Sequence, residues 1–186
     1  MLAKITRQVL ESYFACKFKA HLKLLDVQGV ASDHLNMIRE DNRRFRTAAK
    51  QGLKNAHGDR IVPTQVNLTK SLLSVGSPLI LEGTFEDEHL HLQFDGIMKM
   101  DGESAIGAFH YAPILFHDGR TVRQPQKQLL EIYATVLHAL QGRTPRAGII
   151  HHKGGIAAKV RLSPDAMVTQ SVLRELRDIR EGVTRC

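Results

Sequence analysis

Apolar and polar residues alternate along the stretch 89–100, which predicts a β-strand with one apolar and one polar face. The polar face carries two imidazoles and a carboxylate, from His89, His91 and Asp95. Gly96 directly follows the carboxylate and permits a bulge or a close backbone approach there. This stretch therefore predicts a half-buried strand with an acidic residue in its middle.

Two further segments are predicted to pair with this strand. Residues 105–116 form the second arm of an antiparallel hairpin, with the turn at 100–103, and residues 79–84 pair on the other side. Pro113 in the second arm favours an edge position or a strand end, because proline lacks the N–H that a ladder needs. We therefore expect a three-stranded meander.

Apolar residues at helical spacing predict four long helices. Their expected extents are 6–25, 33–57, 125–141 and a last helix after residue 163. Capping residues mark the expected ends: Thr6, Ser32 or Asp33, and Ser163 with Pro164 at the starts, and Gly58 and Gly142 at the ends. Strand-like signals between 61 and 69 are short and broken, and 147–152 and 156–162 predict another hairpin. This order predicts an α/β fold with a mixed sheet.

The charge balance favours a polyanionic partner. The chain has 186 residues, enough for one domain, and Lys and Arg outnumber Asp and Glu by 26 to 19, for a net charge of +7. Nucleic acid is the first candidate, and a basic but otherwise ordinary protein is the alternative. The second predicted helix is the most cationic segment, with Arg43, Arg44 and Lys50 as candidate phosphate contacts. Its acids Glu40 and Asp41 fit either a metal site or surface ion pairs.

The two cysteines, Cys16 and Cys186, form no disulfide framework and suit a reducing compartment. The first residues lack the apolar core of a signal peptide, and no apolar run approaches the roughly 20 residues that span a bilayer. We expect a cytoplasmic protein with no membrane partner. From its apolar neighbours alone, Cys16 is expected to be a small buried hydrophobe.

Asp95 is the centre of the candidate chemistry. A carboxylate on a polar strand face can bind Mg²⁺ or Mn²⁺, which activates water for phosphodiester hydrolysis. Such a site needs another acid and usually a lysine, but the same-face positions on the next strand hold no acid and no lysine: Ala108, His110 and Ala112. His110 could bind a metal or act as a base, and Lys127 and Gln128 could reach a phosphate. The alternative is a solvated polar face without a metal.

Several phrases in the chain resemble RecB-like nucleases of the PD-(D/E)XK superfamily, relatives of CRISPR-associated exonucleases. They lie at 10–20, 94–97, 109–116, 140–145 and 148–152, and the order of elements is that of the superfamily core. The resemblance implies a restriction-endonuclease-like core with a mixed central sheet and flanking helices. It also implies metal-dependent cleavage of DNA, with Asp95 as the acid of the second motif.

The resemblance leaves the catalytic set incomplete. The strand that carries an acid and a lysine in active enzymes has Phe109, His110 and Tyr111 here. The glutamine and tyrosine of RecB-type enzymes correspond approximately to Gln128 and Tyr133, one residue too far apart, and Glu40 and His57 are candidates for the first motif. Three hypotheses remain open: a metal-dependent DNA nuclease, a catalytically inactive DNA-binding module in a repair or helicase assembly, and a structural remnant.

Cys16 matches the first ligand of an iron–sulfur cluster found in many of these relatives. The chain ends at Cys186, about where their C-terminal cysteine cluster begins, and two cysteines cannot supply four thiolates. We therefore expect residues 1–186 to form a single nuclease domain without that cysteine cluster and without an iron–sulfur cluster.

Overall fold

The computed structural model describes most of the chain, namely residues 3–27, 29, 32–58, 61–62, 65–155, 157–163 and 166–182. Six helices occur in this part: α1 (Arg7–Ala15), α2 (Lys17–Leu24), α3 (Asp33–His57), α4 (Lys70–Ser74), α5 (Gln124–Gln141) and α6 (Ala166–Arg180). Within the same residues, no helix combines the length and the apolar character needed to cross a bilayer.

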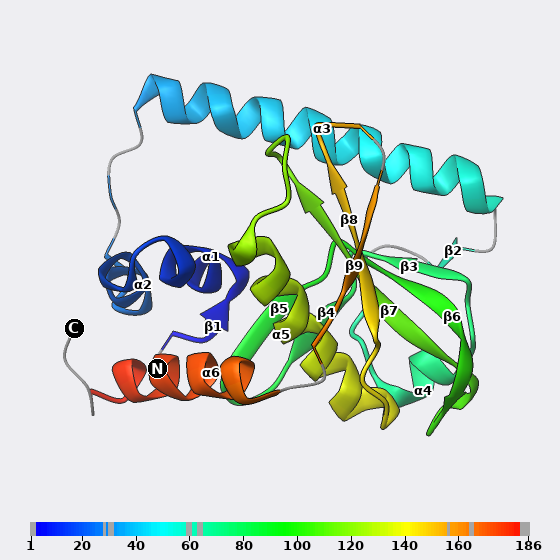
Figure 1. Cartoon of the computed structure of the whole chain (residues 1–186). Helices are drawn as coiled ribbons and strands as arrows, with labels where there is room; N and C mark the ends of the chain where they lie inside the picture. Colours follow the sequence, from blue (N-terminus) through cyan, green and yellow to red (C-terminus); the bar gives the residue numbers. More distant parts are fainter. Residues whose placement is uncertain are drawn as a thin grey trace.

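The strands form two mixed sheets (Figure 1). The smaller has the order β1-β5-β4, with bounds Ile5–Thr6, Leu90–Gln93 and Thr84–Glu86. The larger has the order β2-β3-β6-β7-β8-β9, with bounds Ile61–Val62, Leu79–Leu81, Gly96–Ser104, Gly107–His117, Ala147–His152 and Ala158–Arg161. Each sheet has parallel and antiparallel pairs, so the prediction of an α/β fold with a mixed sheet is confirmed.

The stretch 89–100 is two strands and not one, which corrects the position predicted for Asp95. β5 ends at Gln93 in the small sheet, and β6 begins at Gly96 in the large sheet. The opposite segment is split in the same way at Glu82, which has a left-handed backbone with φ of 54°. The Glu82 N–H donates to the Asp95 carbonyl at 3.3 Å, so the break between β3 and β4 lies opposite the break between β5 and β6. Asp95 therefore lies at the junction of the two sheets.

The predicted hairpin exists, but its turn lies further along the chain. β6 continues through residues 100–103 to Ser104, and the turn is Ala105–Ile106. Pro113 was expected at an edge position or a strand end; β7 itself lies between β6 and β8, but β8 pairs with β7 only from Ile114 onward. Pro113 precedes by one residue the first pair of the β7–β8 ladder, Ile114 with Ile149. Its missing N–H therefore falls just outside that ladder.

The predicted caps are largely confirmed. The Thr6 hydroxyl accepts a hydrogen bond from the Val9 N–H at 3.4 Å, and α3 starts at Asp33 as expected. Gly58 and Gly142 adopt left-handed backbones with φ of 60° and 67°, the conformation that ends helices. The N-terminal position expected for Pro164 lies outside the described residues. The short helix α4 was not predicted, although Thr69 is its N-cap.

The first predicted helix is interrupted at Cys16, which has an extended backbone between α1 and α2. Cys16 is exposed, so the expectation of a buried cysteine is wrong. The physical reason is the break itself, since Cys16 no longer belongs to the apolar face of a continuous helix.

The large sheet is covered on both faces, and this arrangement positions the candidate site. Alternating strand residues such as Ile80, Ile97 and Leu115 join the core that contains α5. The intervening residues, such as Leu81 and Ile114, form a second cluster with residues of α3. Figure 1 shows α3 crossing the top of the sheet, with α1, α2 and α6 beside the small sheet. Both sheet faces are thereby used in packing.

Candidate functional site

Asp95 is held by two arginines and a backbone N–H. Its Oδ2 accepts from Arg7 Nη1 at 2.7 Å and from the Phe116 N–H at 2.6 Å, and its Oδ1 accepts from Arg46 Nη1 at 2.6 Å. Both guanidiniums also donate to the Phe116 carbonyl, from Arg7 Nη2 at 3.2 Å and Arg46 Nη2 at 3.4 Å. We call these four residues the Asp95 cluster.

Four elements that are distant in sequence build this cluster. Arg7 is the first residue of α1, directly after the Thr6 cap, and Arg46 lies midway along α3. Phe116 lies on β7 two residues beyond Ile114, which pairs with Gly96 at the start of β6. The break between the sheets thus brings the Asp95 carboxylate within reach of two helices.

Asp95 and Arg7 are largely withdrawn from water, with side chains 9% and 15% exposed. Burial alone would lower the pKa of Arg7, but the Asp95 carboxylate and other neighbours outweigh burial, so the pKa of Arg7 is raised. Arg7 Nε also donates to Glu11 at 2.7 Å. The negative charge of the Asp95 carboxylate is therefore neutralised by arginine side chains of the protein itself.

A polar pocket of about 280 Å³ opens beside the cluster. Its wall comes from α1, α3, the end of β7 and the start of α5, and includes Arg7, Glu11, Asn42, Arg46, His117, Asp118 and Gln126. Asn42 Nδ2 donates to Asp118, and burial lowers the pKa of His117. These contacts leave most of the charged groups inside the pocket already paired.

The donor set around Asp95 does not fit Mg²⁺ or Mn²⁺. Such an ion is bound through one or two carboxylates whose oxygens are open to it, together with waters and substrate oxygens. Both oxygens of Asp95 instead accept charge-assisted hydrogen bonds from guanidiniums. Among the residues that the structure describes, no group of three or more His, Cys, Asp or Glu side chains could hold a metal ion.

His110, predicted as a metal ligand or base, does not lie with Asp95. It faces Met100 across the β6–β7 ladder, whereas Ile114 faces Gly96, the residue after Asp95. Four residues of strand correspond to roughly 13 Å. His110 is buried, and burial lowers its pKa. Its Nδ1 is 3.4 Å from the Gly102 carbonyl oxygen, at the other end of the strand.

The residues predicted on α5 have different environments. Lys127 is exposed and follows Gln126, which lines the pocket, and Gln128 is partly exposed. Tyr133 is fully buried, where its hydroxyl donates to the Gln93 carbonyl at 3.0 Å and its ring stacks on Phe94 at 4.4 Å. Burial raises the pKa of Tyr133. Tyr133 therefore supports the strand that leads to Asp95.

The basic residues predicted on α3 are mostly paired. Arg43 Nη2 lies 2.7 Å and Arg44 Nε 3.2 Å from Glu40, with side chains 76% and 78% exposed. Lys50 pairs with Glu82, next to the break that positions Asp95. Glu40, a candidate for the first motif, is thus engaged in surface ion pairs, and His57 is the last residue of α3.

Arg7 and Arg46, the residues that define the cluster, were not singled out from the sequence. Arg46 precedes Leu53 by seven residues, so both share the face of α3 that packs on the sheet. A charged residue on an apolar helix face indicates a buried partner, and this signal could have identified Arg46.

No protein-family model matches the chain, and no curated protein matches it.

Proposed function

We propose that the chain is a DNA-binding module with a nuclease-type fold of the RecB-like, PD-(D/E)XK kind, in which Asp95 is a structural residue. The observation that carries this proposal is the ion-paired state of Asp95, whose two oxygens are engaged by Arg7 and Arg46. A mixed sheet with helices on both faces is compatible with that fold.

DNA is supported as the partner by charge. The net charge of +7 attracts a polyanion, and exposed cations that form no ion pair with a described residue occur on α2, on α3 and at the start of α5, namely Lys19, Lys23, Arg39 and Lys127. Phosphate contacts from lysine and arginine need no catalytic metal. In this function the module positions DNA, for example within a repair or helicase assembly, and another component carries out the chemistry.

Metal-dependent hydrolysis of DNA with Mg²⁺ or Mn²⁺ is the second candidate. One observation favours it besides the sequence resemblance: a polar pocket opens beside the Asp95 cluster. The two arginines would have to leave the carboxylate before a metal ion could bind there.

One assay separates these functions. The chain is incubated with labelled single-stranded and double-stranded DNA, with Mg²⁺, Mn²⁺ or a chelator, beside an Asp95→Asn variant whose folding is checked by circular dichroism. Salt-sensitive binding without cleavage supports the DNA-binding module. If the wild-type protein cleaves DNA and Asp95→Asn does not, the nuclease function would replace the DNA-binding module as the conclusion. Absence of both, or binding of RNA in place of DNA, would overturn the proposal.

A further inference from the structure

The pocket beside the Asp95 cluster has a balanced interior. Its lining carries the guanidiniums of Arg7 and Arg46 against the carboxylates of Glu11 and Asp118, and both guanidiniums also pair with Asp95. His117 adds no positive charge near neutral pH, because burial lowers its pKa. A phosphate therefore gains little electrostatic attraction inside the pocket itself.

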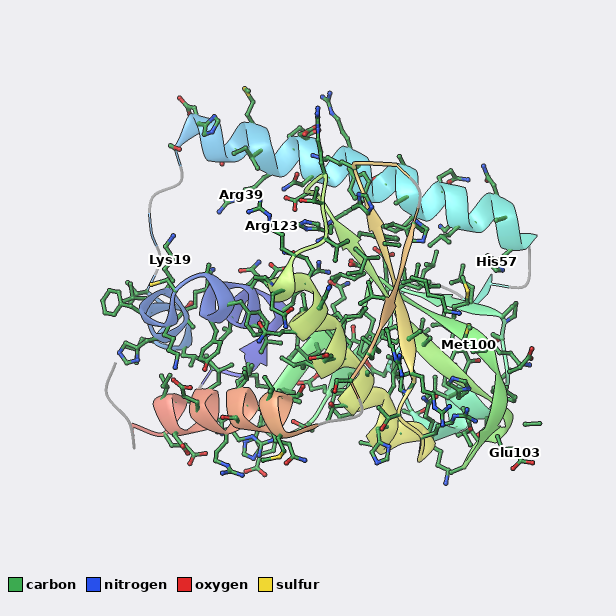
Figure 2. The ribbon with its side chains drawn as sticks, in the orientation of Figure 1. Lys19, Arg39, His57, Met100, Glu103 and Arg123 are labelled. Carbon is green, nitrogen blue, oxygen red and sulfur yellow. The ribbon has the colours of Figure 1, made fainter. Side chains whose placement is uncertain are left out.

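The surroundings of the pocket differ from its interior. Arg39 lies one helical turn before Asn42 and two turns before Arg46, so it shares the face of α3 that lines the pocket. Arg123 directly precedes α5, two residues before Pro125 in the pocket wall. Figure 2 shows Arg39 extending from α3 toward α1, and Arg123 at the start of α5. Both are exposed, and neither forms an ion pair with a residue that the structure describes.

We infer that DNA lies across the mouth of this pocket, with backbone phosphates bound by Arg39 and Arg123. This inference rests on the proposed function and adds the path of the nucleic acid. Cations without a carboxylate partner are free to replace the counterions of a phosphate, whereas Arg43 and Arg44 already share Glu40. The start of α5 adds the positive end of an 18-residue helix to the same side of the pocket.

The test is a salt titration of binding to a fluorescein-labelled DNA duplex, followed by fluorescence anisotropy. Arg39→Gln and Arg123→Gln are each expected to weaken binding by roughly eightfold at about 0.1 M salt and to lower the slope of log K against log salt by about one. The combined variant lowers the slope by about two.

Arg44→Gln is the matched control. It removes the same charge from the same helix as Arg39→Gln, but Arg44 is paired with Glu40 and lies two residues from both Asn42 and Arg46, away from the pocket face. Its binding constant is expected to change by less than about twofold. Thermal unfolding of all variants checks that the fold is retained.

The possible outcomes test the DNA path and the DNA-binding function separately. Weaker binding confined to Arg39→Gln and Arg123→Gln supports the path. If the wild-type protein binds DNA and Arg44→Gln weakens this binding as much as Arg39→Gln does, the proposed path is overturned. The DNA-binding function is then retained. Wild-type protein that binds no DNA overturns both.

Discussion

Replacing Asp95 with alanine is expected to lower the free energy of unfolding by about 3 kcal/mol. The change leaves two guanidiniums without their carboxylate and the buried Phe116 N–H without an acceptor. Removing one partner of a buried ion pair costs about 3 to 5 kcal/mol. The low end applies here, because the Arg46 side chain is 34% exposed and can turn into water.

Urea denaturation followed by far-ultraviolet circular dichroism measures this loss. For a chain of this size, the same change lowers the melting temperature by roughly 6 to 12 °C. Asp41→Ala is the matched control, because Asp41 also forms an ion pair, with Lys153, but its side chain is 72% exposed. That control is expected to lose much less stability.

A double-mutant cycle then assigns the loss to the pair. In an Arg46→Ala background, Asp95→Ala is expected to cost about 1 to 3 kcal/mol less than in the wild type. A single-variant loss no larger than that of Asp41→Ala would refute the structural role of Asp95. Stabilisation by Asp95→Ala would refute it too, and would point to a carboxylate kept for chemistry at the expense of stability.

Three further predictions concern the rest of the fold. Gln141→Leu is expected to cost about 3 kcal/mol in urea denaturation, because the buried amide pairs with both the N–H and the carbonyl of Tyr111. Gly142→Ala is expected to cost about 1 to 2 kcal/mol by the same measurement, since its φ is 67° and an added Cβ would lie 2.9 Å from that of Ala105. The urea concentration at the unfolding midpoint is expected to decrease when the pH is lowered from about 7.5 to about 5.5. Substitution of the histidines is expected to make this decrease smaller. The reason is that burial lowers the pKa of three histidines below the ordinary 6.5, so the unfolded chain binds more protons as the pH falls: His110, His117 and His151.

Local signals in the sequence predicted the helix ends well. Thr6, Gly58 and Gly142 act through hydrogen bonds or backbone conformation within a few residues of themselves, so their effect can be read without the rest of the chain. The break at Cys16 and the short helix α4 were missed. Neither is marked by a proline or glycine at the break or the helix itself, and the packing of α1 against α2 is a tertiary effect.

The candidate site was only partly predictable, since Asp95 was identified but its environment was not. Alternation of residue types predicts the face of a strand only while the strand continues, and β5 and β6 separate at this residue. The pairing of Asp95 with Arg7 and Arg46 spans 88 and 49 residues of chain. Contacts at such separations follow from the packing of helices on the sheet, and no short pattern encodes them.

By itself, the sequence determined the mixed α/β class, the capped helices and the excess of positive charge, because these depend on local periodicity, capping chemistry and composition. Only the tertiary structure decided which cations remain available and which carboxylates are neutralised. That outcome depends on distances of a few ångströms between α1, α3 and the junction of two sheets, where a charge is either paired or left to bind a partner.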